Sequence, residues 1–194
     1  EAPAFGPASP YNPQSPYSAS KAASDHLARA WHYTYGLPVI VTNCSNNYGP
    51  YQFPEKFIPL FIINSLLGKK LPLYGNGSRD WLFVEDHCTA LQAVLDRGEP
   101  GSTYMLGGEA ERSNLETATL ICDILDRRMP RSGKGSYVDS IEFVEERPGH
   151  DHRYAIDIAE SRSRLGWSPS TGFTNGMEKT VEWYLANRGW WQKI

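Results

Sequence analysis

The sequence predicts an α/β fold with a mainly parallel sheet, and three observations carry this prediction. Apolar, β-branched runs alternate with helical segments along the chain. The run LPVIVTNC at residues 37–44 has the uninterrupted apolar character of a parallel strand buried on both faces. Hydrophobic residues make up 40% and aromatic residues 12% of the 194 positions, which is enough for a packed core and excludes general disorder.

The first quarter of the chain predicts a proline-rich lead-in, a helix, a strand and a loop. Ser15 is the expected helix cap and Pro16 the first helical residue, and the helix should end at Gly36. The strand at 37–44 follows, and the composition of residues 45–54 then predicts a loop.

The rest of the chain repeats the alternation. Ser113 and Glu116 form a capping-box pattern that should open a helix. Residues 130–140 read as a loop rich in Pro, Gly and Ser. The expected helices are 55–68 (with Pro59 in its first turn), 85–98, 115–129, a short one ending at 165–167, and 176–187. The expected strands are 71–75, 79–84, 103–108 and 141–146.

Composition also excludes several classes of function. The formal charge is 19 − 22 = −3, without a long basic run, which disfavours nucleic acid as a partner. The longest apolar stretch, residues 57–67, is too short and too interrupted to span a membrane. Cys44, Cys88 and Cys122 form no CxxC pair, so we expect reduced thiols, a cytoplasmic protein and no metal site. No GxGxxG motif follows a strand, so the sequence predicts no dinucleotide cradle of its own.

Tyr17 and Lys21 lie four residues apart, on one face of the first predicted helix. A tyrosine phenol has a reference pKa of about 10 and needs a nearby cation to act as a base near neutral pH. The pair therefore suits proton abstraction from an alcohol or sugar hydroxyl. The alternative is an exposed Tyr/Lys pair on a surface helix, and the spacing alone favours that alternative.

Polar and cationic residues follow the predicted strands. Asn46 and Asn47 come after a buried strand, where α/β proteins bind ligands, although such residues also form ordinary turns. Lys56, Arg79, Arg147 and His150 together would suit a diphosphate, although for each residue alone a solvated surface charge is the favoured interpretation. We interpret Glu85-Asp86 as the start of a helix and His87 as a packing residue.

Several of these segments together resemble one enzyme family. The segments are SPYSASKAASDHLARAWHYTYGLP, TNCSNNYGPYQFPEKFIP, RDWLFVEDH, ERPGHDHRYAID and KTVEWYL. They resemble the carboxyl-terminal 60% or so of the dTDP-glucose 4,6-dehydratases, which are extended short-chain dehydrogenases/reductases. The resemblance covers nearly the whole chain. YxxxK is shared by the superfamily, whereas NNYGPYQFPEK together with RPGHDHRY is specific to this family.

The resemblance implies a partial Rossmann-like NAD(P)-binding fold plus a smaller α/β substrate-binding lobe. Residues 1–54 would be the remainder of the cofactor domain. Residues 55–194 would mainly form the lobe, with 80–98 returning to the cofactor domain. The family uses NAD to convert dTDP-glucose into dTDP-4-dehydro-6-deoxyglucose and water, a step toward rhamnose and other deoxysugars. It commonly forms homodimers through the helix that bears Tyr17.

The resemblance also assigns roles to individual residues. Tyr17 matches the tyrosine that takes the proton from the glucose 4-hydroxyl, and Lys21 matches the lysine that supports it and binds nicotinamide ribose. Tyr17, Lys21 and Asn47 fall at cofactor-binding positions. The substrate-binding positions fall on Asn46, Lys56, Phe57, Pro72, Leu73, Tyr74, Arg79, Asn114, Glu146, Arg147, Pro148, Gly149 and His150.

The chain departs from the family pattern in three respects. The Rossmann half with its glycine fingerprint and the Thr-Asp-Glu triplet for water elimination are absent from the sequence. The turn before Arg79 is about two residues shorter than usual. We therefore expect the 194 residues alone not to dehydrate the sugar nucleotide. Two alternatives stay open, namely a related sugar-nucleotide epimerase or decarboxylase, and a non-catalytic nucleotide-sugar-binding remnant.

Overall fold

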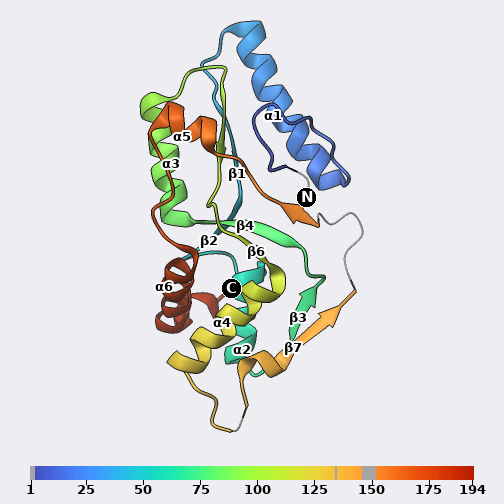
Figure 1. Cartoon of the computed structure of the whole chain (residues 1–194), viewed down its shortest axis with the longest axis vertical. Helices are drawn as coiled ribbons and strands as arrows, with labels where there is room; N and C mark the ends of the chain where they lie inside the picture. The colour runs from blue at the N-terminus through green and yellow to red at the C-terminus, as the bar shows by residue number, and fades with distance from the viewer. Residues whose placement is uncertain (1–2, 134, 146–151) are drawn as a thin grey trace.

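The computed structural model describes residues 3–133, 135–145 and 152–194, and helices alternate with strands through them (Figure 1). The helices are α1 (Pro16–Tyr35), α2 (Phe57–Leu66), α3 (Val84–Arg97), α4 (Asn114–Arg128), the 3₁₀ helix η1 (Tyr137–Ser140), α5 (Ala159–Leu165), α6 (Phe173–Ala186) and α7 (Arg188–Trp191). The strands are β1 (Val41–Cys44), β2 (Asn46–Tyr48), β3 (Leu71–Tyr74), β4 (Ser78–Phe83), β5 (Thr103–Leu106), β6 (Glu111–Ser113), β7 (Ile141–Val144) and β8 (Arg153–Tyr154).

The strands form three small sheets, and the pairing confirms the predicted parallel character. β1 pairs with β5, and β3 pairs with β7, both in parallel. β4 is the centre of the remaining sheet, with β2 and β8 parallel to it and β6 antiparallel. The chain is therefore an α/β protein in which β4 contacts more strands than any other described strand does.

The predicted ends of two helices are confirmed by their capping bonds. The Ser15 side chain accepts a hydrogen bond from the Ser18 amide at the start of α1. Gly36 closes that helix in the left-handed region with φ 68°, a conformation that glycine adopts without a Cβ penalty. At α4, Ser113 and Glu116 exchange the two bonds of a capping box.

Other predicted boundaries were wrong. The first strand begins at Val41 rather than at residue 37. Residues 46–48, expected in a loop, form β2, because pairing with β4 overrides the low strand propensity of asparagine. A 3₁₀ helix at 137–140 interrupts the predicted 130–140 loop, and α6 begins three residues earlier than expected, at Phe173.

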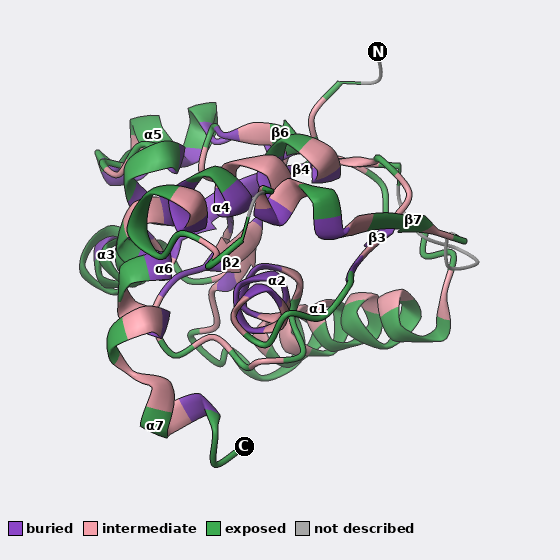
Figure 2. Ribbon diagram, turned by 90° about the horizontal axis from the view of Figure 1, so that it is seen from below, coloured by how far each residue is buried: buried purple, intermediate pink, exposed green. Residues whose placement is uncertain are grey.

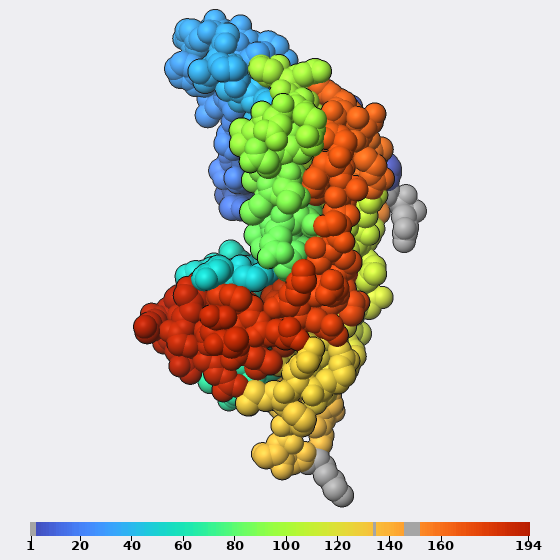
Figure 3. All heavy atoms as spheres, turned by 90° about the vertical axis from the view of Figure 1, so that its left-hand side faces the viewer, coloured from blue at the N-terminus to red at the C-terminus, as the bar shows by residue number. Residues whose placement is uncertain are grey.

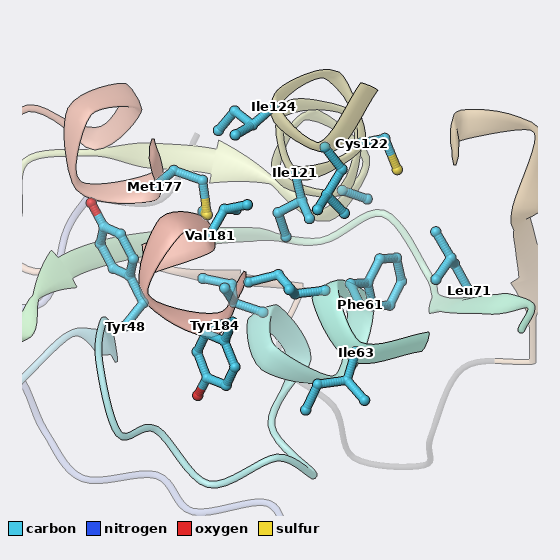
Figure 4. Close-up of a cluster of buried hydrophobic side chains, with 14 of the residues drawn as sticks. Tyr48, Phe61, Ile63, Leu71, Ile121, Cys122, Ile124, Met177, Val181 and Tyr184 are labelled. Atoms are coloured by element: carbon cyan, nitrogen blue, oxygen red, sulfur yellow. The ribbon is translucent and has the colours of Figure 1, made fainter. Parts of the chain in front are cut away.

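Two hydrophobic clusters divide the molecule. The larger one lies between α2, α4 and α6, with side chains such as Phe61, Ile121 and Val181 meeting at its centre (Figure 4). The smaller one lies between α3, β5 and the segment around α5, and contains Leu82, Val94 and Leu106. We call these the lower and the upper region after their places in Figure 1. The upper cluster takes residues from 104–106 and 156–167 as well as from 80–98.

α1 lies against the upper region without burying any residue (Figures 1 and 2). Polar side chains attach it to the sheet. Asn43 donates a hydrogen bond to Asp25 at 2.8 Å, and Arg29 donates one to Thr103 at 2.9 Å. Of the helices in the described ranges, none has the combined length and apolarity that crossing a bilayer requires.

Candidate functional site

A cavity of about 420 Å³ lies where β2, β3, β4 and the starts of α2 and α4 meet. Seven predicted substrate-binding residues from five segments line it, namely Asn46, Lys56, Phe57, Pro72, Tyr74, Arg79 and Asn114. Glu55, Leu60, Phe61 and Trp81 complete the lining and were not predicted. The structure thus brings together residues that lie up to 68 positions apart in the sequence, from Asn46 to Asn114.

The alternation along β3 decides which of its residues face the cavity. Pro72 and Tyr74 line the cavity, whereas Leu71 and Leu73 are buried in the core of the lower region. The Leu73 side chain is 1% exposed. Leu73 can therefore offer a ligand only its backbone, which limits the contact that the resemblance implied.

The start of α2 gives the cavity a cation beside an aromatic surface. Lys56 precedes the first turn, and its ammonium lies 3.1 Å from a carboxylate oxygen of Glu55. Phe57 packs on Phe61 with ring centroids 4.6 Å apart and lies 6.1 Å from the Trp81 ring. A flat aromatic group could stack on Phe57 here, and an anion could bind the Lys56 ammonium.

Arg79 lines the cavity although the turn before it is short. Its side chain is 7% exposed and donates a hydrogen bond to the Ser78 carbonyl at 2.7 Å. The turn is held by α4, because the Asn114 amide donates to the Gly77 carbonyl at 3.0 Å. Only glycine fits at position 77, since a Cβ there would lie 2.7 Å from the His152 carbonyl oxygen. The short turn therefore leaves Arg79 at the cavity wall.

Tyr17 and Lys21 lie outside this cavity, in the first two turns of α1. The Tyr17 side chain is 75% exposed. Cys44 is the last residue of β1, and burial raises the pKa of its thiol. A hydrogen bond from Asn47 and the charge of Lys21 oppose that shift. The ammonium is thus within electrostatic reach of the strand end where Asn47 lies. Figure 3 shows this face hollowed between α1 and the α6–α7 region.

Asn47 lies one residue after Asn46 on β2 and is absent from the cavity lining. Its amide nitrogen donates to the Ser45 carbonyl at 3.0 Å and to the Cys44 sulfur at 3.4 Å. Its amide oxygen lies 2.6 Å from Nδ1 of His87. We interpreted His87 as a packing residue, and the sequence carried no signal for this contact, because 40 positions separate the two residues.

Asp86 has contacts beyond the predicted start of a helix. Beyond opening α3, its carboxylate accepts hydrogen bonds from the Ser170 hydroxyl at 2.7 Å and the Thr171 amide at 2.8 Å. It thereby ties the upper region to the segment that leads into α6.

The predicted residues Glu146, Arg147, Pro148, Gly149 and His150 lie outside the described residues. The strand that follows them is firmly placed, because Arg153 binds both carboxylate oxygens of Glu111, at 2.6 and 2.9 Å. Within the described part of the chain, no group of three or more His, Cys, Asp or Glu side chains is arranged to hold a metal ion.

Comparison with known proteins shows that the chain is similar to sugar-nucleotide enzymes. Residues 2–180 match the sequence model of the family described as GDP-mannose 4,6 dehydratase. A dTDP-glucose 4,6-dehydratase of Neisseria meningitidis serogroup B is 57% identical over 194 residues, covering 98% of this chain and 55% of that protein. The dTDP-glucose 4,6-dehydratase 1 of Escherichia coli K12 is 56% identical, over 98% of this chain and 53% of its own length. The chain spans about half the length of the curated relatives it matches.

Solved structures agree on the fold. A dTDP-glucose 4,6-dehydratase of Streptomyces venezuelae, crystallised with NAD, superposes with a TM-score of 0.92 at 44% identity, over 100% of this chain and 58% of that one. The Bacillus anthracis enzyme in complex with NAD gives 0.89 at 46% identity, over 100% and 59%. A UDP-glucuronic acid 4-epimerase of Bacillus cereus, at 23% identity and a TM-score of 0.83, shares the fold alone. The predicted extended short-chain dehydrogenase/reductase fold is confirmed.

Proposed function

The chain belongs to the GDP-mannose 4,6 dehydratase family, and on that premise we propose that its protein is a dTDP-glucose 4,6-dehydratase. The reaction converts dTDP-glucose into dTDP-4-dehydro-6-deoxyglucose and water. The observation that carries the proposal is the cavity, where seven residues that the family resemblance assigns to substrate binding meet. Relatives that carry this name and are 57% and 56% identical support the choice of dTDP-glucose as the substrate.

The lining of the cavity suits a nucleoside diphosphate. Lys56 and Arg79 supply the positive charge that a diphosphate requires, and the planar guanidinium can bind two phosphate oxygens at once. Phe57 and Tyr74 offer ring faces on which a thymine base can stack. The volume of about 420 Å³ lies within the range typical of small-molecule sites. Arg147 would add a further charge, as the family resemblance implies.

The chain would contribute the proton acceptor for the first half of the reaction. The Tyr17 oxygen would remove the proton of the sugar 4-hydroxyl as the C4–H bond breaks, and Lys21 lies about one turn further along the same helix. The new 4-keto group acidifies the C5 proton, which leaves with the C6 hydroxyl as water. NAD, when bound, would supply the hydride acceptor and donor that the reaction needs.

The residues at the carboxyl end of β1 fit a nicotinamide cofactor. This end of a parallel strand is where open α/β sheets bind such ligands. Lys21 acts electrostatically on Cys44 there, and Asn47 is hydrogen-bonded to the same residue. Tyr17, Lys21 and Asn47 are therefore the residues of this chain that we propose to hold NAD.

We further propose how the chain is organised and where it acts. The cofactor domain would comprise residues 1–54 with the returning segment 80–98, and the lobe the remainder of 55–194. A homodimer would form through α1, whose side chains Leu27, Trp31 and Tyr35 lie one turn apart and are 63%, 54% and 71% exposed. We place the protein in the cytoplasm, on a route to rhamnose or another deoxysugar.

Calorimetric titration with dTDP tests the proposal. We expect dTDP to bind, and Lys56→Ala and Arg79→Ala each to weaken it by about tenfold, because each removes a charged partner of phosphate. Lys69→Ala, which removes an exposed lysine after α2 that does not line the cavity, is the matched control. Tighter binding of GDP than of dTDP, or equal affinity in all variants, would contradict the proposed substrate.

A further inference from the structure

Asn47 is held in a single orientation by its neighbours. The Ser45 carbonyl can only accept a hydrogen bond, so the group 3.0 Å from it must be the amide nitrogen of Asn47. The same nitrogen also donates to the Cys44 sulfur at 3.4 Å. The amide oxygen therefore faces α3, where it lies 2.6 Å from Nδ1 of His87.

This orientation fixes the proton on His87. An amide oxygen can only accept, so Nδ1 must carry the hydrogen that lies between the two residues. Burial lowers the pKa of His87, so its imidazole is neutral near pH 7 and exists as the Nδ1–H tautomer. Without the Asn47 oxygen as acceptor, the neutral imidazole would not be restricted to the Nδ1–H tautomer.

The backbone of Asn47 is held independently of His87. The Gln52 side chain donates to the Asn47 carbonyl at 2.9 Å, and the pairing of β2 with β4 fixes the strand. Loss of His87 would thus free the Asn47 side chain while leaving the backbone in place. The His87 side chain is half-buried, and its ring nitrogen contacts the side-chain amide of Asn47 rather than the Asn47 backbone.

We propose that His87 is a positioning residue, which orients the Asn47 carboxamide so that Asn47 presents one fixed set of polar atoms to the nicotinamide cofactor. This inference rests on the proposed function, in which Asn47 contacts NAD. His87 itself does not need to contact the cofactor. The adjacent Asn46 faces the substrate cavity and lies outside this set of hydrogen bonds, so the positioning should concern the cofactor and not the nucleotide sugar.

Two variants of His87 separate positioning from packing. In His87→Asn, the side-chain amide nitrogen lies where Nδ1 lies in histidine and can donate to Asn47. In His87→Leu, the volume is largely kept but the donor is lost, so the Asn47 oxygen is left without this partner. A packing role predicts that leucine is the better replacement, whereas a positioning role predicts that asparagine is.

The first measurement is ¹H–¹⁵N NMR of the histidine ring and of the Asn47 side-chain amide. We expect His87 as the Nδ1–H tautomer in the wild-type protein. The Asn47 amide hydrogens should exchange slowly in the wild type and in His87→Asn, and faster in His87→Leu. An Nε2–H tautomer, or Asn47 signals that His87→Leu leaves unchanged, would overturn the proposal.

The second measurement is titration of the full-length protein with NAD and, separately, with dTDP. We expect His87→Leu to weaken NAD by about fivefold, the value of one hydrogen bond, and His87→Asn to restore it. The affinity for dTDP should stay within about twofold in both variants, since Asn46 is not displaced. Equal NAD affinity in His87→Leu and wild type would overturn the role toward the cofactor. Failure of the wild type to bind NAD would contradict the proposed function, while the NMR result would still decide whether His87 orients Asn47.

Discussion

α1 and α2 show how differently the two regions of the molecule are stabilised. Six of the ten residues of α2 are buried, and its apolar side chains interlock with those of α4 and α6 (Figure 4). None of the twenty residues of α1 is buried, and hydrogen bonds from Asn43 and Arg29 attach it to the sheet. The lower region thus closes its own core, whereas α1 leaves its apolar side chains exposed. The cavity is built mainly on the self-contained region, and the proposed base on the exposed helix.

The largest effect on stability should come from the core of the lower region. Ile121 on α4 is fully buried, so Ile121→Ala should lower the free energy of unfolding by about 2–5 kcal/mol. Leu95→Ala on α3 in the upper region is the matched control, and the loss of its exposed side chain should cost no more than about 0.5 kcal/mol. Urea unfolding measures both. Equal losses would show that the two regions are stabilised alike.

Asp86 joins the regions, and Asp86→Asn should cost about 1–3 kcal/mol, because two hydrogen bonds to a buried carboxylate are weakened. Burial alone would raise the pKa of Asp86, but the bonds from Ser170 and Thr171 outweigh it and lower the pKa. Because the pKa of Asp86 in the folded state lies below its unfolded-state value of about 3.9, the ionised carboxylate stabilises the fold above that pH. This stability is lost as the pH falls through the folded-state pKa.

Urea unfolding at pH 7 and below about pH 4 tests this sign. The difference in unfolding free energy between wild type and Asp86→Asn should have its largest value at pH 7 and become smaller in acid. Ser168→Ala, two residues before Ser170 on an exposed position, serves as the control. A difference that grows as the pH falls would refute the assignment.

Tyr51 attaches the loop after β2 to the lower region. Its ring centroid lies 4.5 Å from that of Trp183 and 5.6 Å from that of Trp190, while its φ of 63° is in the left-handed region. Tyr51→Ala loses the ring contacts and keeps the strained backbone, at a cost of about 1–2 kcal/mol. Tyr51→Gly loses the same contacts but relieves the strain, so it should be the more stable of the two in thermal unfolding. The reverse order would show that the backbone conformation carries no strain.

Tyr17→Phe should have the smallest effect on stability, since the hydroxyl belongs to a side chain that is 75% exposed. The unfolding free energy should change by less than about 0.5 kcal/mol, whereas the dehydratase activity of the full-length protein should fall by about 10²–10⁴. The affinity for dTDP, measured by calorimetry, should be kept. Wild-type turnover in this variant would mean that Tyr17 is not the base.

Local signals in the sequence were sufficient for most of the helices and strands, whereas seven of the residues that line the cavity were named from the family resemblance. Ser15, Gly36 and the Ser113–Glu116 capping box fix helix ends through bonds within four residues, and these predictions are confirmed. The strand at residues 46–48 was missed because its pairing partner lies at residues 81–83. The residues Trp81 and Phe61 were missed for a similar reason, since only the packing of β4 against α2 brings them to the cavity.

The contacts of His87 and Asp86 were beyond sequence reasoning as well. Each bonds a partner at least 40 positions away, with Asn47 on one side and Ser170 and Thr171 on the other. Hydrophobic period and capping patterns report on neighbours within about one helical turn, so they carry no information on such pairs. Leu73 shows a different limit, because its place on the buried face of β3 follows from the local strand alternation, whereas the family resemblance assigned it to substrate binding.

β4 runs into α3 without an intervening residue, since the strand ends at Phe83 and the helix begins at Val84. Arg79 at the substrate cavity and His87 beside Asn47 therefore sit on one continuous, hydrogen-bonded length of backbone. This backbone is a direct path along which a ligand at one end can act on the other. If dTDP changes the affinity for NAD, thermodynamic linkage requires NAD to change the affinity for dTDP by the same factor, and titration of each ligand in the presence of the other measures both.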